Sequence, residues 1–158
     1  LKYQGEFDLA TGESYASLEQ SLTGVRVLLL NQFGGTEIDV ALPGGTYHGA
    51  GTRGWKANGS HTRWKYSDKT TDGMLTTAYA GIYEVQVSDR DRRTPREVQV
   101  KVGGRFGSYP VVALDSPVRM IVVLGGQAAA IDGMCGETAF VAADCTFNNI
   151  GTSLSCRM

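Results

Sequence analysis

The chain has 158 residues, enough to bury the core of one domain without the help of metals or several disulfides. Its hydrophobic share of 42% and charged share of 20% are ordinary for a globular domain, which disfavours disorder, and no apolar run is long enough to cross a bilayer. The formal net charge of -1 provides no overall positive field, so we predict no nucleic-acid partner and no membrane span.

We divide the chain into an N-terminal segment, residues 1–24, and a β-sandwich domain over residues 25–158. The segment holds the one credible helix, at residues 12–22. Ser14 can cap this helix, and apolar residues recur at helical spacing behind it, at Tyr15, Leu18 and Leu22. We therefore expect at most one short helix, close to the N-terminus.

The first nine residues are predicted to form an extended strand. Tyr3, Phe7 and Leu9 lie on one side of such a strand, an apolar set too small to justify an isolated element. We predict that the strand docks on the open sheet edge of a neighbouring copy, which would satisfy its backbone groups and bury these side chains. The alternative is that it pairs within its own domain.

Glycines separate the other β-branched and aromatic runs, a pattern typical of many short strands joined by tight turns. We expect 81–87 and 96–102 to pair antiparallel, and the last three strands to form a cysteine-containing meander. The pattern predicts an all-β, antiparallel sandwich or jelly roll of about eight to ten strands. The expected strands are residues 25–30, 37–42, 62–66, 81–87, 96–102, 120–124, 136–141, 145–147 and 152–156.

A glycine-rich stretch at residues 43–59 is predicted to be a long loop with one short strand at most. Loops of this kind often carry function. Tyr47 and Trp55 lie within it, and flat aromatic side chains with polar tips suit sugar rings, so we name these two as candidate ligand-binding residues. Trp64 and Tyr66 share one face of the next strand, for which core packing is the better interpretation.

Little else in the sequence points to chemistry. Nucleophile elbows, phosphate-binding loops and dinucleotide fingerprints are absent, and His48 and His61 have no supporting spacing, so we expect no enzyme and no cofactor. Asp68 and Asp72 precede a glycine in a loop and form a weak calcium candidate, for which a solvated turn is the simpler interpretation. We otherwise predict no metal.

The three cysteines lie within the last 24 residues. This clustering favours a local disulfide made in an oxidising compartment, with one thiol left over. We expect the bridge between Cys145 and Cys156, with Cys135 as an alternative partner. A zinc site would need a closer cysteine pair or neighbouring histidines.

Several short motifs recur in order along the second part of the chain. This pattern resembles a β-domain of uncharacterised secreted or cell-surface proteins of bacteria, over roughly residues 55–158. That resemblance implies an extracellular setting and brings no catalytic residues with it. The motifs are Arg63-Trp64-Lys65-Tyr66-Ser67-Asp68-Lys69, Gly81-Ile82-Tyr83-Glu84-Val85, Val100-Lys101-Val102-Gly103-Gly104, Tyr109-Pro110-Val111, Pro117-Val118-Arg119 and Cys135-Gly136-Glu137.

These observations favour a secreted or cell-surface, non-enzymatic structural or interaction domain. We expect a subunit of a surface fibre or pilus-like assembly, or one module of a surface protein, whose partner is another copy or another surface protein. The alternative is a carbohydrate-binding module, with a glycan as its ligand. Exposure of Trp55 and Tyr47 on one face would favour the alternative.

Overall fold

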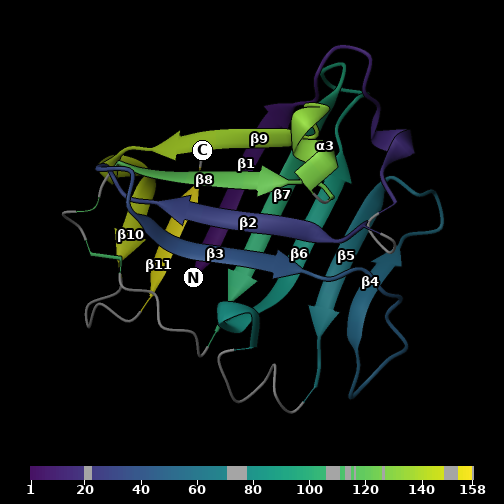
Figure 1. Ribbon diagram of the computed structural model, residues 1–158, viewed down its shortest axis with the longest axis horizontal. Helices are drawn as coiled ribbons and strands as arrows, with labels where there is room; N and C mark the ends of the chain where they lie inside the picture. The colour runs from purple at the N-terminus through teal and green to yellow at the C-terminus, as the bar shows by residue number, and fades with distance from the viewer. Residues whose placement is uncertain are drawn as a thin grey trace.

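The computed structural model describes residues 1–19, 23–70, 78–105, 111–112, 115, 117–125, 127–147 and 153–157. In these ranges the chain forms two β-sheets, one of seven strands and one of four, packed face to face (Figure 1). The predicted all-β sandwich is confirmed. No helix in the described ranges is long and apolar enough to span a membrane.

The seven-stranded sheet contains both ends of the described chain. Its strands are antiparallel to their neighbours, except that β1 and β11 run parallel. In spatial order they are β10 (Cys145–Phe147), β11 (Leu154–Arg157), β1 (Lys2–Asp8), β7 (Glu97–Gly104), β6 (Ile82–Asp89), β5 (Arg63–Asp68) and β4 (Arg53–Ala57).

The four-stranded sheet lies across the first, and Figure 1 shows its strands crossing those of the larger sheet. Such crossing is one of the two ways in which sheets pack face to face. Its strands are β3 (Thr36–Leu42), β2 (Val25–Leu30), β8 (Val118–Val123) and β9 (Cys135–Phe140). The short helices are η1 (Tyr15–Ser17), η2 (Ala78–Gly81), α3 (Gln127–Ile131) and η4 (Ala142–Asp144).

The core fills the space between the sheets, because alternate residues of each strand point inward. The hairpin of β6 and β7 shows this best, since Val85 lies opposite Val102 and Val87 opposite Val100, and all four side chains are buried. The predicted pairing of these two strands is confirmed. The predicted inward residues are buried as expected: Ile82, Val98, Val100 and Val102.

The two sheets also touch directly at one corner, where β9 lies over β1. The ring of Tyr3 meets the ring of Phe140 edge to face, with ring centroids 5.0 Å apart. The Tyr3 hydroxyl and the Thr138 side chain of β9 lie on the same side of Gly5. An aromatic side chain from the first strand therefore joins the two sheets.

The helix predicted at residues 12–22 is described only in part. In its described residues a 3-10 turn forms at Tyr15–Ser17, with the Ser14 hydroxyl oxygen accepting a hydrogen bond from the Ala16 N–H at 3.1 Å, as expected of a cap. Leu18 has an extended backbone, which ends the turn; residues 20–22 lie outside the described ranges. The helix α3 was not predicted.

The predicted terminal meander does not form. Strand β9 pairs with β8 in the four-stranded sheet, whereas β10 and β11 belong to the seven-stranded sheet. The turn η4 lies between β9 and β10 and carries the chain from one sheet to the other. Alternation of apolar residues identifies a strand but does not tell which of two sheets it joins.

Candidate functional site

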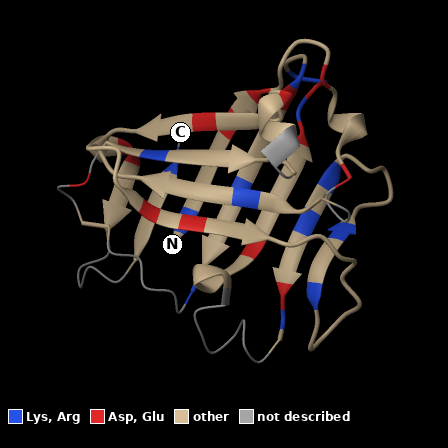
Figure 2. Cartoon of the chain, viewed as in Figure 1, with Lys and Arg blue, Asp and Glu red and all other residues tan. Residues whose placement is uncertain are grey.

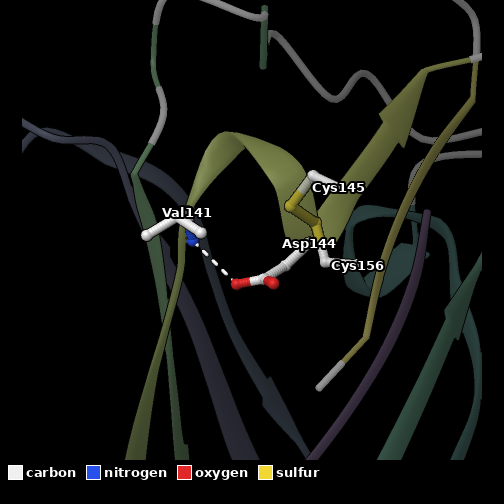
Figure 3. The surroundings of a disulfide bond; sticks show 4 residues. All are labelled: Val141, Asp144, Cys145 and Cys156. Carbon is white, nitrogen blue, oxygen red and sulfur yellow. Dashed lines mark hydrogen bonds between the residues drawn. A yellow bond between two sulfur atoms is a disulfide. The ribbon is translucent and has the colours of Figure 1, made fainter.

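The disulfide joins the two strands at one end of the seven-stranded sheet. Cys145 and Cys156 lie directly opposite each other in β10 and β11 and are bonded, as expected (Figure 3). Beside them, the Val141 N–H donates a hydrogen bond of 3.0 Å to the Asp144 carboxylate, which holds the turn η4 (Figure 3). Cys135 lies in the other sheet and is a free thiol.

The N-terminal strand, named above for assembly, is used within its own chain. All seven residues of β1 pair with β7, and three of them pair with β11 on the other side. Tyr3 and Leu9 are buried, and Phe7 packs against the core. Strand β1 is therefore paired within its own sheet, on both sides over its first three residues, and the core covers its apolar side chains, so the alternative of pairing within its own domain is the arrangement in this chain.

The two aromatic candidates, Trp55 and Tyr47, differ in exposure in the structure. Trp55 is fully buried, its indole N–H donates a hydrogen bond of 2.9 Å to the Pro43 carbonyl, and its ring packs on Tyr66. The interpretation of Trp55 as an exposed sugar platform was wrong, because its position in β4 points into the core. Tyr47 is partly exposed and lines a hollow described below.

Asp68, the described member of the calcium candidate, is buried and already has partners. Its carboxylate accepts hydrogen bonds from the backbone N–H and the hydroxyl of Thr70, and Arg53 lies 3.6 Å from its second oxygen. Asp72 lies outside the described residues. Within the described ranges, no group of three or more His, Cys, Asp or Glu side chains is placed to hold a metal.

An apolar hollow of about 240 Å³ opens beside the disulfide. Val112, one of the residues around it, is more than half exposed. Its described lining is Val111, Val112, Val118, Ala142, Cys145, Phe147 and Leu154.

The outer face of the seven-stranded sheet, turned away from the core, carries a feature that was not predicted. One side chain from each of six adjacent strands lies in a single row across the strands, because their residues are direct partners in the sheet register. We call this set the cationic row. In spatial order it is Arg157, Gln4, Lys101, Gln86, Lys65 and Lys56.

The row contains four cations and two amides, with no acidic side chain. Adjacent strands lie about 4.8 Å apart, so the five steps span about 24 Å. Lys65 makes an ion pair of 2.9 Å with Glu84. In the described part of the chain, Lys56, Lys101 and Arg157 make no ion pair. Figure 2 shows basic positions on the neighbouring strands β4 and β5.

Two shallow hollows lie along the row, and each takes half of it. The first, of about 270 Å³, is lined by Arg157, Gln4 and Lys101, together with Lys2 and Tyr83. The second hollow, of about 390 Å³, is lined by the other three residues of the row and by a tyrosine. Its lining includes Gln86, Lys65, Lys56, Arg63 and Tyr47.

The tyrosine of the first hollow has a defined place. Tyr83 lies at an irregularity in the β6–β7 pairing, and its ring lies against the outer side of Gly103. The guanidinium carbon of Arg105 sits 4.9 Å from the centre of this ring. A β-carbon at position 103 would lie 3.3 Å from the Tyr83 hydroxyl oxygen, a tight contact that glycine avoids.

Alternation alone indicates that each member of the row points outward. It does not show that they share a row, because that depends on the register of five strand pairs. The fold and this face define an all-β sandwich domain with a polar, cation-bearing sheet surface. No family model, curated protein or solved structure matches the chain.

Proposed function

We propose that this chain is a non-enzymatic, extracellular binding domain, one module of a secreted or cell-surface protein. Two features support this. The disulfide between Cys145 and Cys156 is of the kind that persists in oxidising compartments outside the cell. The motif resemblance to secreted bacterial β-domains points to the same setting.

The observation that carries the proposal is the cationic row with its two hollows. A ligand site on a sheet face needs polar groups placed at fixed spacing on rigid elements, and hydrogen-bonded strands supply both. Six strands each contribute one polar side chain, and the core side chains behind them are buried, which holds the sheet in place. Such a surface suits an extended ligand that crosses the strands.

A subunit of a surface fibre is the second form of the proposal, and the described geometry favours it less. The strand expected to join neighbouring copies, β1, lies inside its own sheet. The edge strand β3 carries the acidic residues Glu37 and Asp39, and charges on an edge strand oppose pairing with another chain. A binding module does not depend on pairing of a strand with another copy.

The test is binding of the purified, oxidised domain to a panel of neutral and acidic polysaccharides, measured by affinity electrophoresis, with sedimentation as a measure of self-association. We expect a monomer that is retarded by at least one polymer, and loss of retardation in the double variant Lys56→Glu/Lys101→Glu. The matched control is Arg92→Glu, an exposed arginine at the β6–β7 turn, away from the row. Retardation that is unchanged in Lys56→Glu/Lys101→Glu would contradict the proposal. Fibres formed equally by this variant and by Arg92→Glu would also contradict it.

A further inference from the structure

We infer that the ligand of this face is a linear anionic polysaccharide that runs across the strands along the cationic row. This inference rests on the proposed function and adds the chemical class of the ligand. Three features of the face point to this class: the charge of the two hollows, their hydrogen-bonding groups and their tyrosines.

This face carries an excess of positive charge, which the molecule as a whole does not. The described linings of the two hollows contain six cationic side chains and one acidic side chain, Glu84, whereas the whole chain has a formal net charge of -1. Glu84 is already paired with Lys65. The six cations are Lys2, Lys101, Arg157, Lys56, Arg63 and Lys65. A local excess of one sign attracts ligands of the opposite sign and fixes how they lie.

The acidic group Glu6, on the next row, is held by side chains outside the row. Glu6 lies in β1, two residues from Gln4, and its carboxylate accepts a hydrogen bond of 2.6 Å from the Gln99 side-chain amide. Gln99 in turn accepts a hydrogen bond of 2.7 Å from Arg90. These groups form a chain of contacts that holds Glu6 beside the row and leaves the ammonium groups of Lys101 and Lys56 exposed.

The hydrogen-bonding groups and aromatic rings of this face favour a polysaccharide over other anionic polymers. Gln4 and Gln86 alternate with the cations, and a side-chain amide both donates and accepts hydrogen bonds, as sugar hydroxyls require. Each hollow also holds one partly exposed tyrosine. The ring of Tyr47 is suited to lie against the apolar face of a sugar, whereas the Tyr83 ring already carries the Arg105 guanidinium and offers its hydroxyl group as a hydrogen-bonding partner. A chain of sugars that carries carboxylate groups matches both sets.

Other polymers fit less well. Single-stranded nucleic acid binds through several exposed aromatic rings together with a strongly positive groove, and here the rings are two and the chain as a whole is not basic. A peptide that recognises a sheet adds to its edge, whereas the row runs over the face.

The experiment uses polygalacturonate as the anionic probe, its fully methyl-esterified form as the matched neutral polymer, and a single-stranded DNA oligonucleotide of similar length. The dissociation constant of each is measured for the oxidised protein, for Lys101→Glu, for Lys56→Glu and for the control Arg92→Glu. We expect polygalacturonate to bind, each row variant to weaken it by about tenfold or more, and the control to match the unaltered protein. Binding should also weaken as salt is raised.

The outcomes separate the inference from the function it rests on. If the esterified polymer binds as tightly as the acidic one and the row variants still weaken both, the face is a binding site and the anionic class is wrong. Tighter binding of the oligonucleotide, with the same sensitivity to the row variants, likewise overturns the polysaccharide class alone. If no probe responds to the row variants while all variants keep the thermal midpoint of the parent, both proposals fail.

Discussion

The ring of Phe7 in β1 fills the space that a β-carbon at Gly136 in β9 would occupy. The two residues belong to different sheets, so this contact sets how closely the corner of the four-stranded sheet approaches the seven-stranded one. A side chain at position 136 would point into the ring. Glycine is required here by close approach rather than by an unusual backbone angle.

Replacing Gly136 with alanine should therefore destabilise the fold. The added methyl group cannot fit unless Phe7 or the β9 backbone moves, and overpacking of this kind costs about 1–3 kcal/mol. The measurement is the free energy of unfolding in urea. Gly59→Ala is the matched control, since its added methyl group meets no atom within 4 Å, and we expect it to change stability by less than about 0.5 kcal/mol. Equal stability of both variants would show that the corner is loosely packed.

Two buried tyrosines should respond oppositely to loss of their hydroxyl groups. The Tyr15 hydroxyl donates a buried hydrogen bond of 2.9 Å to the Val87 carbonyl, so Tyr15→Phe should cost about 1 kcal/mol. The Tyr66 hydroxyl is buried without a hydrogen-bond partner among the described residues, so Tyr66→Phe should leave stability unchanged or raise it. Urea unfolding of both variants measures the difference. A loss in Tyr66→Phe that equals the loss in Tyr15→Phe would contradict this assignment.

The same tyrosines should make the fold sensitive to alkali. Burial raises the pKa of Tyr15 and of Tyr66, in each case because the charged phenolate is poorly solvated there. The folded state then keeps its protons when the unfolded state loses them, so stability is full below the ordinary tyrosine pKa of about 10 and falls as the pH rises above it. Each tyrosine contributes a slope of about 1.4 kcal/mol per pH unit.

Urea unfolding at pH values from 8 to about 11.5 measures this slope, with the starting point set by the ordinary tyrosine pKa. In the double variant Tyr15→Phe/Tyr66→Phe, the fall in the free energy of unfolding with pH should be shallower by about 2.7 kcal/mol per pH unit. Tyrosinate absorbance is the control. If all the tyrosines ionise near pH 10 while the protein stays folded, the assigned direction of these two pKa values is wrong.

Much of the fold was predictable because apolar alternation is a local signal. Residues 25–30 and 37–42 were expected as strands, and they form β2 and most of β3, which pair antiparallel. The element α3 was missed because a five-residue helix shows too little periodicity to separate it from a glycine-rich turn. Short helices are held by packing rather than by their own sequence.

The candidate site was less predictable, because it depends on which strands are neighbours. Trp55 was expected in a loop, yet it lies in β4, where its position in the register turns it inward beside Tyr66. The cationic row joins Gln4 to Lys101 across 97 residues of sequence, and no pattern in one segment reveals that pairing. The disulfide was an exception, since its two cysteines are near each other in sequence and needed no long-range information.

The bond between Cys145 and Cys156 should support the end of the seven-stranded sheet that carries Arg157. Strand β10 has only three residues, and its pairing with β11 is the described sheet contact that holds it. Removing a disulfide that closes a loop of this size costs about 2–4 kcal/mol, so the double variant Cys145→Ser/Cys156→Ser should unfold at lower urea concentration. Cys135→Ser is the control, because its thiol is free and only partly buried, and its replacement should have a much smaller effect.

Hydrogen exchange then tests where the stability is lost when the disulfide is removed. Protection should fall in β10 and β11 while β6 and β7 stay protected, and a uniform loss across the sheet would contradict a local role for the bond.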